Sequence, residues 1–193
     1  AILTGGELLN PGRLLLAGPA GTPPEESVRR APAMSLEAIP DADKRPPRFF
    51  EQAFAAALDT YRNQPATVEL DCTAGCDADR VRAAAERHPD RILWARGGPV
   101  NLAPPGVIGS SDEPVLLVVP DGAVALDVQM HGLIYGAGGG WTGDGTLRGA
   151  LIDAGDFAGG ATFDVLRDAA VRDRLRWRTG SFVRVPGGWR DYR

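Results

Sequence analysis

The chain has 193 residues, of which 44% are hydrophobic, and this composition is enough for one principal domain with a sizeable core. No apolar run approaches the ~18 to 20 residues of a membrane span, and no signal-peptide pattern is present. The net charge is −4, yet residues 167–193 hold eight arginines against three aspartates. This excess can mark a docking surface for an acidic partner, but a solvated basic face is the commoner outcome. No motif or interleaved aromatic residue accompanies the arginines, so nucleic-acid binding is not expected.

Residues 1–48 are crowded with Pro and Gly and show no sustained periodicity, so we predict a loop-rich N-terminal arm. Its leucines are expected to pack this arm against the domain. Residues 49–193 are predicted to form a single β-rich α+β domain. Apolar residues at 50, 54, 57, 58 and 61 predict one amphipathic helix over 49–61, ended by Pro65.

Further along, residues 67–71 alternate and predict a strand, Asp77 is placed to cap a helix over 78–88, and Ile92 begins the next strand. Residues 99–163 are short apolar segments broken by Gly, Pro and Asp. Residues from Asp164 to about Trp177 return to helical composition, and a turn-rich tail follows.

Two internal alignments predict the architecture. Residues 131–138 realign on 148–155, an offset of 17, and residues 92–102 realign on 116–126, an offset of 24. A repeated strand and turn cannot bury its own apolar face, so such units stack on each other. The predicted fold is therefore α+β and β-rich, a short right-handed β-solenoid-like stack with flanking helices. Gly132 and Gly149 would permit close approach between coils. Five apolar residues are expected to pack together: Leu117, Leu133, Ile134, Leu151 and Ile152.

Cys72 and Cys76 are the only cysteines and stand at a predicted strand-to-helix turn. A disulfide across this short loop is geometrically possible and would imply an oxidising compartment. The alternative is a pair of small buried residues in a reducing cell. A zinc site is not expected, because His88 and His131 would have to converge from distant segments.

His131 is the natural candidate for a general base, with Asp127 and Arg148 in plausible reach, but a histidine packed on the flank of the stack is the commoner case. The serines lack a glycine-flanked elbow, so no nucleophile is expected.

The glycine-rich residues 138–145 predict a mobile, hairpin-like tip, where Trp141 either folds back or stacks on a partner or sugar. Calcium binding by Asp144, Asp153 and Asp156 is a weaker possibility. No catalytic residue, metal or cofactor is predicted.

Five segments, in this order, resemble the C-terminal region of PilX-type minor pilins, which are type IV pilus assembly proteins of Gram-negative bacteria. The closing stretch is the most specific, since such proteins often end in a Pro-Gly-Ser-Trp-Arg-Asp-like sequence; here Gly188 replaces the serine. The resemblance covers about half the chain. Its segments are residues 115–119 (VLLVV), 132–135 (GLIY), 149–152 (GALI), 163–166 (FDVL) and 185–191 (VPGGWRD).

The resemblance implies a non-enzymatic periplasmic headgroup that primes or decorates a pilus, with other pilins as partners. The membrane helix of such proteins is missing here, so membrane contact is expected only through a helix preceding this sequence. Trp177 together with Trp189, Arg190 and Asp191 would anchor the tail or contact a partner. Two alternatives stay open: a β-helix enzyme or carbohydrate-binding module using His131 and Trp141, and a self-assembling bactofilin-like filament protein.

Overall fold

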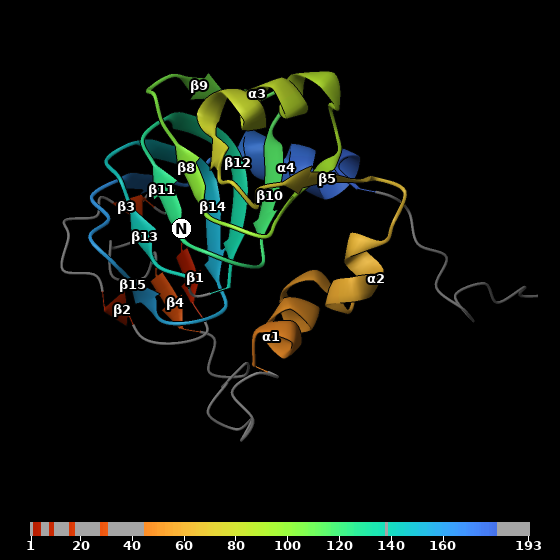
Figure 1. Cartoon of the computed structure of the whole chain (residues 1–193), viewed down its shortest axis with the longest axis horizontal. Helices are drawn as coiled ribbons and strands as arrows, with labels where there is room; N and C mark the ends of the chain where they lie inside the picture. The colour runs from red at the N-terminus through yellow and green to blue at the C-terminus, as the bar shows by residue number, and fades with distance from the viewer. Residues whose placement is uncertain are drawn as a thin grey trace, which may run out of the picture.

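The computed structural model describes residues 2–4, 8–9, 16–17, 28–30, 45–137 and 139–180. Strands fill the centre of the molecule, with α3 along one end and with α1 and α2 to one side (Figure 1). The helices are α1 (Arg45–Phe54), α2 (Leu58–Arg62), α3 (Ala78–Arg87) and α4 (Ala169–Arg178). The expected class, an α+β protein rich in strands, is confirmed.

All named strand pairs are parallel and belong to three sheets. The large sheet has the order β3-β16-β14-β12-β10-β7-β5, with β1, β4 and β9 attached. A smaller sheet has the order β13-β11-β8-β6, and β15 pairs with β2. The strands are β1 (Ile2–Thr4), β2 (Leu8–Leu9), β3 (Leu16–Ala17), β4 (Val28–Arg30), β5 (Thr67–Asp71), β6 (Cys76–Asp77), β7 (Ile92–Arg96), β8 (Val100–Leu102), β9 (Val107–Ile108), β10 (Val115–Val119), β11 (Val124–Leu126), β12 (Gln129–Gly136), β13 (Trp141–Thr142), β14 (Thr146–Asp153), β15 (Phe157–Ala158) and β16 (Asp164–Leu166).

The pairing registers reproduce both internal alignments. At the larger of the two offsets, Leu116 of β10 is the partner of Ile92 of β7, and Val124 of β11 is the partner of Val100 of β8. At the smaller offset, Gly132 of β12 is the partner of Gly149 of β14. Residues that align in the sequence therefore lie side by side in neighbouring strands.

The N-terminal segment, expected as a loop-rich arm, contributes four short strands to these sheets. β1 pairs with β14, β2 with β15 and β3 with β16. Their registers pair Ile2 with Leu151, Leu8 with Phe157 and Leu16 with Val165, so the separation along the chain is the same in all three pairs. These strands are too short for a periodicity to be visible in the sequence.

Both faces of the large sheet pack apolar side chains, and this corrects one packing prediction. Its inner face, with Leu117, Ile134 and Leu151, packs in a core shared with the smaller sheet and α3. Its outer face, with Leu133 and Ile152, packs in a separate cluster with residues of α1, α2 and α4. The expected single cluster of five is therefore wrong for these two residues, because successive side chains of a strand point to opposite faces.

Two helix predictions need correction. The single helix expected over 49–61 is split into α1 and α2, and the break follows Ala55, whose φ is +55°. Phe50 of α1 and Tyr61 of α2 still meet, with ring centroids 5.2 Å apart, so both helices cover the same sheet face. The helix expected from Asp164 is preceded by β16, because residues 164–166 extend the sheet beside β14.

The strand, helix and strand predicted between residues 67 and 96 are confirmed as β5, α3 and β7. Asp77 caps α3 by accepting a hydrogen bond from the Arg80 amide at 2.8 Å, and His88 ends the helix. Ala78, Val81 and Ala84 lie on the buried side of α3 and join the inner core. Local capping chemistry and one apolar stripe were sufficient to predict this unit.

Candidate functional site

An apolar groove of about 750 Å³ lies on the outer face of the large sheet and is lined by residues of α1, α2 and α4. Leu116, Leu133 and Ala150 form its floor as successive partners across β10, β12 and β14. These strands are paired on both edges, so the floor offers side chains and no free main-chain groups in this region. The groove can therefore receive apolar side chains.

The wall on the α1 and α2 side is aromatic. The rings of Phe54 and Tyr61 lie 5.0 Å apart and both line the groove. Burial raises the pKa of Tyr61 to about 12, so its phenol stays neutral at physiological pH. Val171 and Leu175 of α4 line the opposite wall. Both walls thus present uncharged surface to the floor between them.

The α4 side of the groove carries a basic margin formed by Arg167, Arg172 and Arg176, all three exposed. Arg172 pairs with its sequence neighbour Asp173 at 2.8 Å, and the guanidinium of Arg176 lies 4.7 Å from the ring centroid of Trp177. Both contacts are at the solvent-exposed surface, where such pairs contribute little and exchange easily. The arginine excess seen in the sequence is thus partly gathered along one edge of an apolar recess.

Asp168 is the carboxylate on this margin, and it is used in capping. Its Oδ1 accepts hydrogen bonds from the amides of Ala170 at 2.9 Å and Val171 at 3.2 Å. A carboxylate at a helix N-terminus satisfies amides that the helix leaves unpaired. Asp168 therefore holds the first turn of α4 in place beside the groove, and the margin keeps an excess of positive charge.

Gly149 and Gly132 lie where neighbouring strands approach each other closely. A Cβ at Gly149 would lie 1.9 Å from the Gly132 carbonyl oxygen and 3.1 Å from Cγ1 of Val171 in α4. A Cβ at Gly132 would lie 1.9 Å from the carbonyl oxygen of Val115. Glycine at both positions allows the strands to pass closely, and at Gly149 it also allows α4 to approach the sheet.

His131, the candidate general base, is half-buried on β12. Its Nδ1 lies 3.5 Å from Ser111 Oγ, and its Nε2 lies 2.9 Å from the side-chain nitrogen of Gln129. Burial and the nearby Arg148 lower the pKa of His131, although Asp168 acts in the opposite direction. A hydroxyl and an amide are thus its hydrogen-bonding neighbours, whereas a catalytic triad orients its histidine with a carboxylate.

The predicted partners of His131 are only partly brought to it. Arg148 is its strand partner on β14. The carboxylate of Asp127 instead accepts a hydrogen bond from the amide of Asp144 at 3.2 Å. Of the two residues expected beside His131, Arg148 is a neighbour of the imidazole, whereas Asp127 is engaged in a turn.

Trp141 lies in the core, so of its two expected positions the folded-back one agrees with the structure and the exposed tip is wrong. Residues 141–142 form β13, which pairs with β11, and Trp141 is 1% exposed. Its Nε1 donates a hydrogen bond to the buried carboxylate of Asp153 at 3.1 Å, and its ring stacks on Phe157. The indole face is covered, so in this structure it cannot stack on a partner or sugar. Burying a ring of this size outweighs the flexibility of the glycines around it.

Cys72 and Cys76 are joined by a disulfide, with their Cα atoms 5.0 Å apart. Both cysteines are buried in the inner core, between the end of β5 and the start of α3. Gly75 between them has φ +86°, a backbone conformation that side chains disfavour. The bond thus closes the strand-to-helix turn that the sequence indicated.

Removing this disulfide is expected to lower the free energy of unfolding by about 2 kcal/mol, because the closed loop is short. The measurement is urea denaturation of the oxidised chain, of the chain in dithiothreitol, and of a Cys72→Ala/Cys76→Ala variant. The reduced chain and the variant should both unfold at a lower urea concentration than the oxidised chain. Coinciding curves for oxidised and reduced protein would show that the bond does not stabilise the fold.

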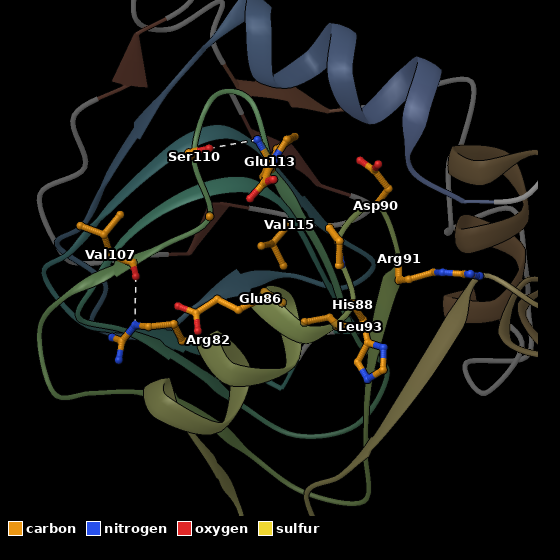
Figure 2. Close-up of a pocket in the computed structure, with 14 residues that line it drawn as sticks. Arg82, Glu86, His88, Asp90, Arg91, Leu93, Val107, Ser110, Glu113 and Val115 are labelled. Atoms are coloured by element: carbon orange, nitrogen blue, oxygen red, sulfur yellow. Dashed lines mark hydrogen bonds between the residues drawn. The ribbon is translucent and has the colours of Figure 1, made fainter.

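A smaller pocket of about 200 Å³ lies between α3 and the segment that follows β9 (Figure 2). Arg82 Nε donates to the carbonyl of Val107 at 3.0 Å, and Ser110 Oγ accepts from the amide of Glu113 at 3.0 Å. Figure 2 places Glu86 on the α3 side, facing this segment. These bonds brace the pocket walls, and its charged side chains are of both signs.

Of the residues expected to anchor the tail, only one lies in the described part of the chain. Trp177 is 68% exposed on α4, whereas Trp189, Arg190 and Asp191 lie outside the described residues. In the part of the chain that the structure describes, no group of three or more metal-ligating side chains is placed to hold an ion. Within the same part, none of the helices combines the length and apolarity that crossing a bilayer requires.

The groove was missed by the sequence reasoning. Of its floor residues, only Leu133 was expected to be packed, and it was placed in the core, since an apolar residue on a strand gives no sign of whether a helix covers it. The only signal toward it was the cluster of arginines from residue 167 onward.

Comparison with known proteins identifies no relative of this chain. No family model, no curated protein and no solved structure matches the chain.

Proposed function

We propose that this chain is a non-enzymatic interaction domain that works outside the cytoplasm, as a minor-pilin-like component of type IV pilus assembly. The observation that carries the proposal is the apolar groove with its basic margin, which lies on the outer face of the sheet. An apolar recess with a charged rim is typical of surfaces that recognise other proteins. The resemblance of the C-terminal half to PilX-type minor pilins supplies the biological setting.

We further propose that the parallel strands form a short solenoid-like stack of coils. Both offsets of the internal alignments recur in the strand registers and support this, since each residue lies beside its counterpart in the next repeat. The N-terminal registers support it too. β1, β2 and β3 pair with β14, β15 and β16 in the same order, and the paired residues have one constant separation along the chain. In this reading the N-terminal segment adds one more coil.

The disulfide supports a location in the periplasm or at the cell envelope, where thiols are oxidised. The surroundings of His131 favour a binding role over the alternative of an enzyme. Its hydrogen-bonding neighbours are Ser111 and Gln129, whereas a Ser-His-Asp triad orients the imidazole with a carboxylate. Burial of Trp141 weighs against the carbohydrate-binding alternative in the same way.

The test is deletion of the gene in a piliated bacterium that carries it. We expect fewer surface pili, restoration by the wild-type gene, and cross-linking of the chain to pilins in the envelope fraction. A His131→Ala copy should restore piliation as well as the wild type does, because no chemistry depends on that residue. Normal piliation after deletion, together with a cytosolic chain, would contradict the proposal, and a chemical activity lost in His131→Ala would favour an enzyme.

A further inference from the structure

The geometry points to the occupant of the groove: an amphipathic α-helix of a partner protein, with apolar side chains on the floor and carboxylates facing α4. This inference deepens the proposed function and takes its biological setting from it. It rests on three features of the described residues: the floor, the two helical walls and the charge of the margin.

The floor favours a helix over an added strand. Leu133 and Ala150 lie in the interior of the large sheet, where β12 and β14 have neighbours on both sides. A peptide strand binds by pairing with a free sheet edge, and this part of the sheet has none to offer. A helix instead binds through side chains alone, which is what a sheet face presents.

The walls favour the same occupant. α1 and α2 lie on one side of the recess and α4 on the other, and all three pack on the same sheet face. A partner helix seated between them would continue this helical layer. Leu133 and Leu175 are only partly buried, so each keeps apolar surface for a partner to cover. Covering such surface is the main source of affinity in helix-in-groove complexes.

The margin sets the charge of the partner. Arg172 and Arg176 of α4 are exposed, as is Arg167 just before the helix, whereas Asp168 on the same margin is engaged in capping. Complementary charges at a rim accelerate association and select between partners. A helix with glutamates flanking its apolar stripe matches this rim, and one with lysines does not.

The test uses the purified full chain and two synthetic amphipathic helices. Both carry leucines at i, i+3, i+4 and i+7; one is flanked by glutamates and the other by lysines. Fluorescence anisotropy should give a dissociation constant at least about tenfold lower for the glutamate helix, and salt should reduce the difference. The Arg172→Glu/Arg176→Glu variant should reverse the preference. The matched Arg80→Glu/Arg87→Glu variant, on the exposed side of α3, should keep it.

A second variant locates the binding surface. Ala150→Glu places a carboxylate on the groove floor and should weaken binding of the glutamate helix at least about tenfold. Ala125→Glu makes the same change at a half-buried position of the smaller sheet and should have no effect. Thermal melts of both variants check that each is folded.

Three results would overturn the inference. Equal affinity for both helices would remove the role of the margin, and full binding by folded Ala150→Glu would place the site elsewhere. Failure to bind either helix would mean that the groove is filled by the chain itself, or by a second copy if sedimentation shows self-association that Ala150→Glu abolishes. Because the assay contains no pilus component, such a failure leaves the outcome of the gene deletion unaffected.

Discussion

Replacing Trp141 by alanine is expected to lower the free energy of unfolding by about 5 kcal/mol, which is enough to unfold many domains of this size. The loss has two sources. Removing a buried indole leaves a large cavity beside Phe157 and Phe163, whose rings it contacts. It also removes the hydrogen bond from Nε1 to Asp153, a carboxylate that is completely buried. Urea denaturation followed by far-ultraviolet circular dichroism measures the change.

Trp177→Ala is the matched control for this prediction. The Trp177 side chain is 68% exposed, so its removal should change the free energy of unfolding by less than about 0.5 kcal/mol. Trp141→Phe separates the two sources of the main effect, because it retains most of the ring and loses the donor. It should cost about 1 to 3 kcal/mol. A Trp141→Ala protein as stable as Trp177→Ala would contradict the buried position of the indole.

Gly149→Val is the second substitution with a large expected effect, a loss of about 3 kcal/mol or more in the free energy of unfolding. The first side-chain atom would already lie 1.9 Å from the Gly132 carbonyl oxygen, a backbone atom that cannot rotate away. The φ of +143° at Gly149 adds strain for any residue with a Cβ. Relief would require β14 to separate from β12 or α4 to move away from the sheet.

Gly160 provides the control for Gly149. Among the residues that the structure describes, a Cβ at Gly160 would meet no atom within 4 Å apart from those of its neighbours in the chain. Gly160→Ala should therefore leave the melting temperature close to that of the wild type, whereas Gly149→Ala should lower it by several degrees and Gly149→Val by more. If the melting temperature of Gly149→Val is unchanged within error, then Gly149 has no architectural role.

The predictions that succeeded concerned features set by residues close together in the sequence. Asp77 was recognised as a helix cap because its side chain bonds an amide three residues on. The alignment of Gly132 on Gly149 predicted a strand register because repeated units place like residues in like environments. Cys72 and Cys76 were paired candidates because only a short loop separates them.

The predictions that failed concerned which distant segments meet. For Trp141 the sequence left a folded-back and an exposed position open, and the buried Asp153 that bonds its N–H could not be predicted. Leu133 was placed in the inner core, yet it faces outward toward the helices. Neither outcome follows from local pattern, because burial depends on what covers a residue after the chain has folded.

The sequence by itself determined the strand-rich class, the capped helix α3 and the spacing of the repeats, and it left open whether Cys72 and Cys76 are joined. Each depends on local backbone and side-chain chemistry, or on a periodicity that the chain carries along its length. Only the tertiary structure decided the pairing of the N-terminal strands, the burial of Trp141 and the presence of the groove. The groove arises where the outer face of the sheet is covered by helices on two sides and left open between them. That arrangement is set by packing between segments far apart in the chain, and the order of residues along one strand carries no record of it.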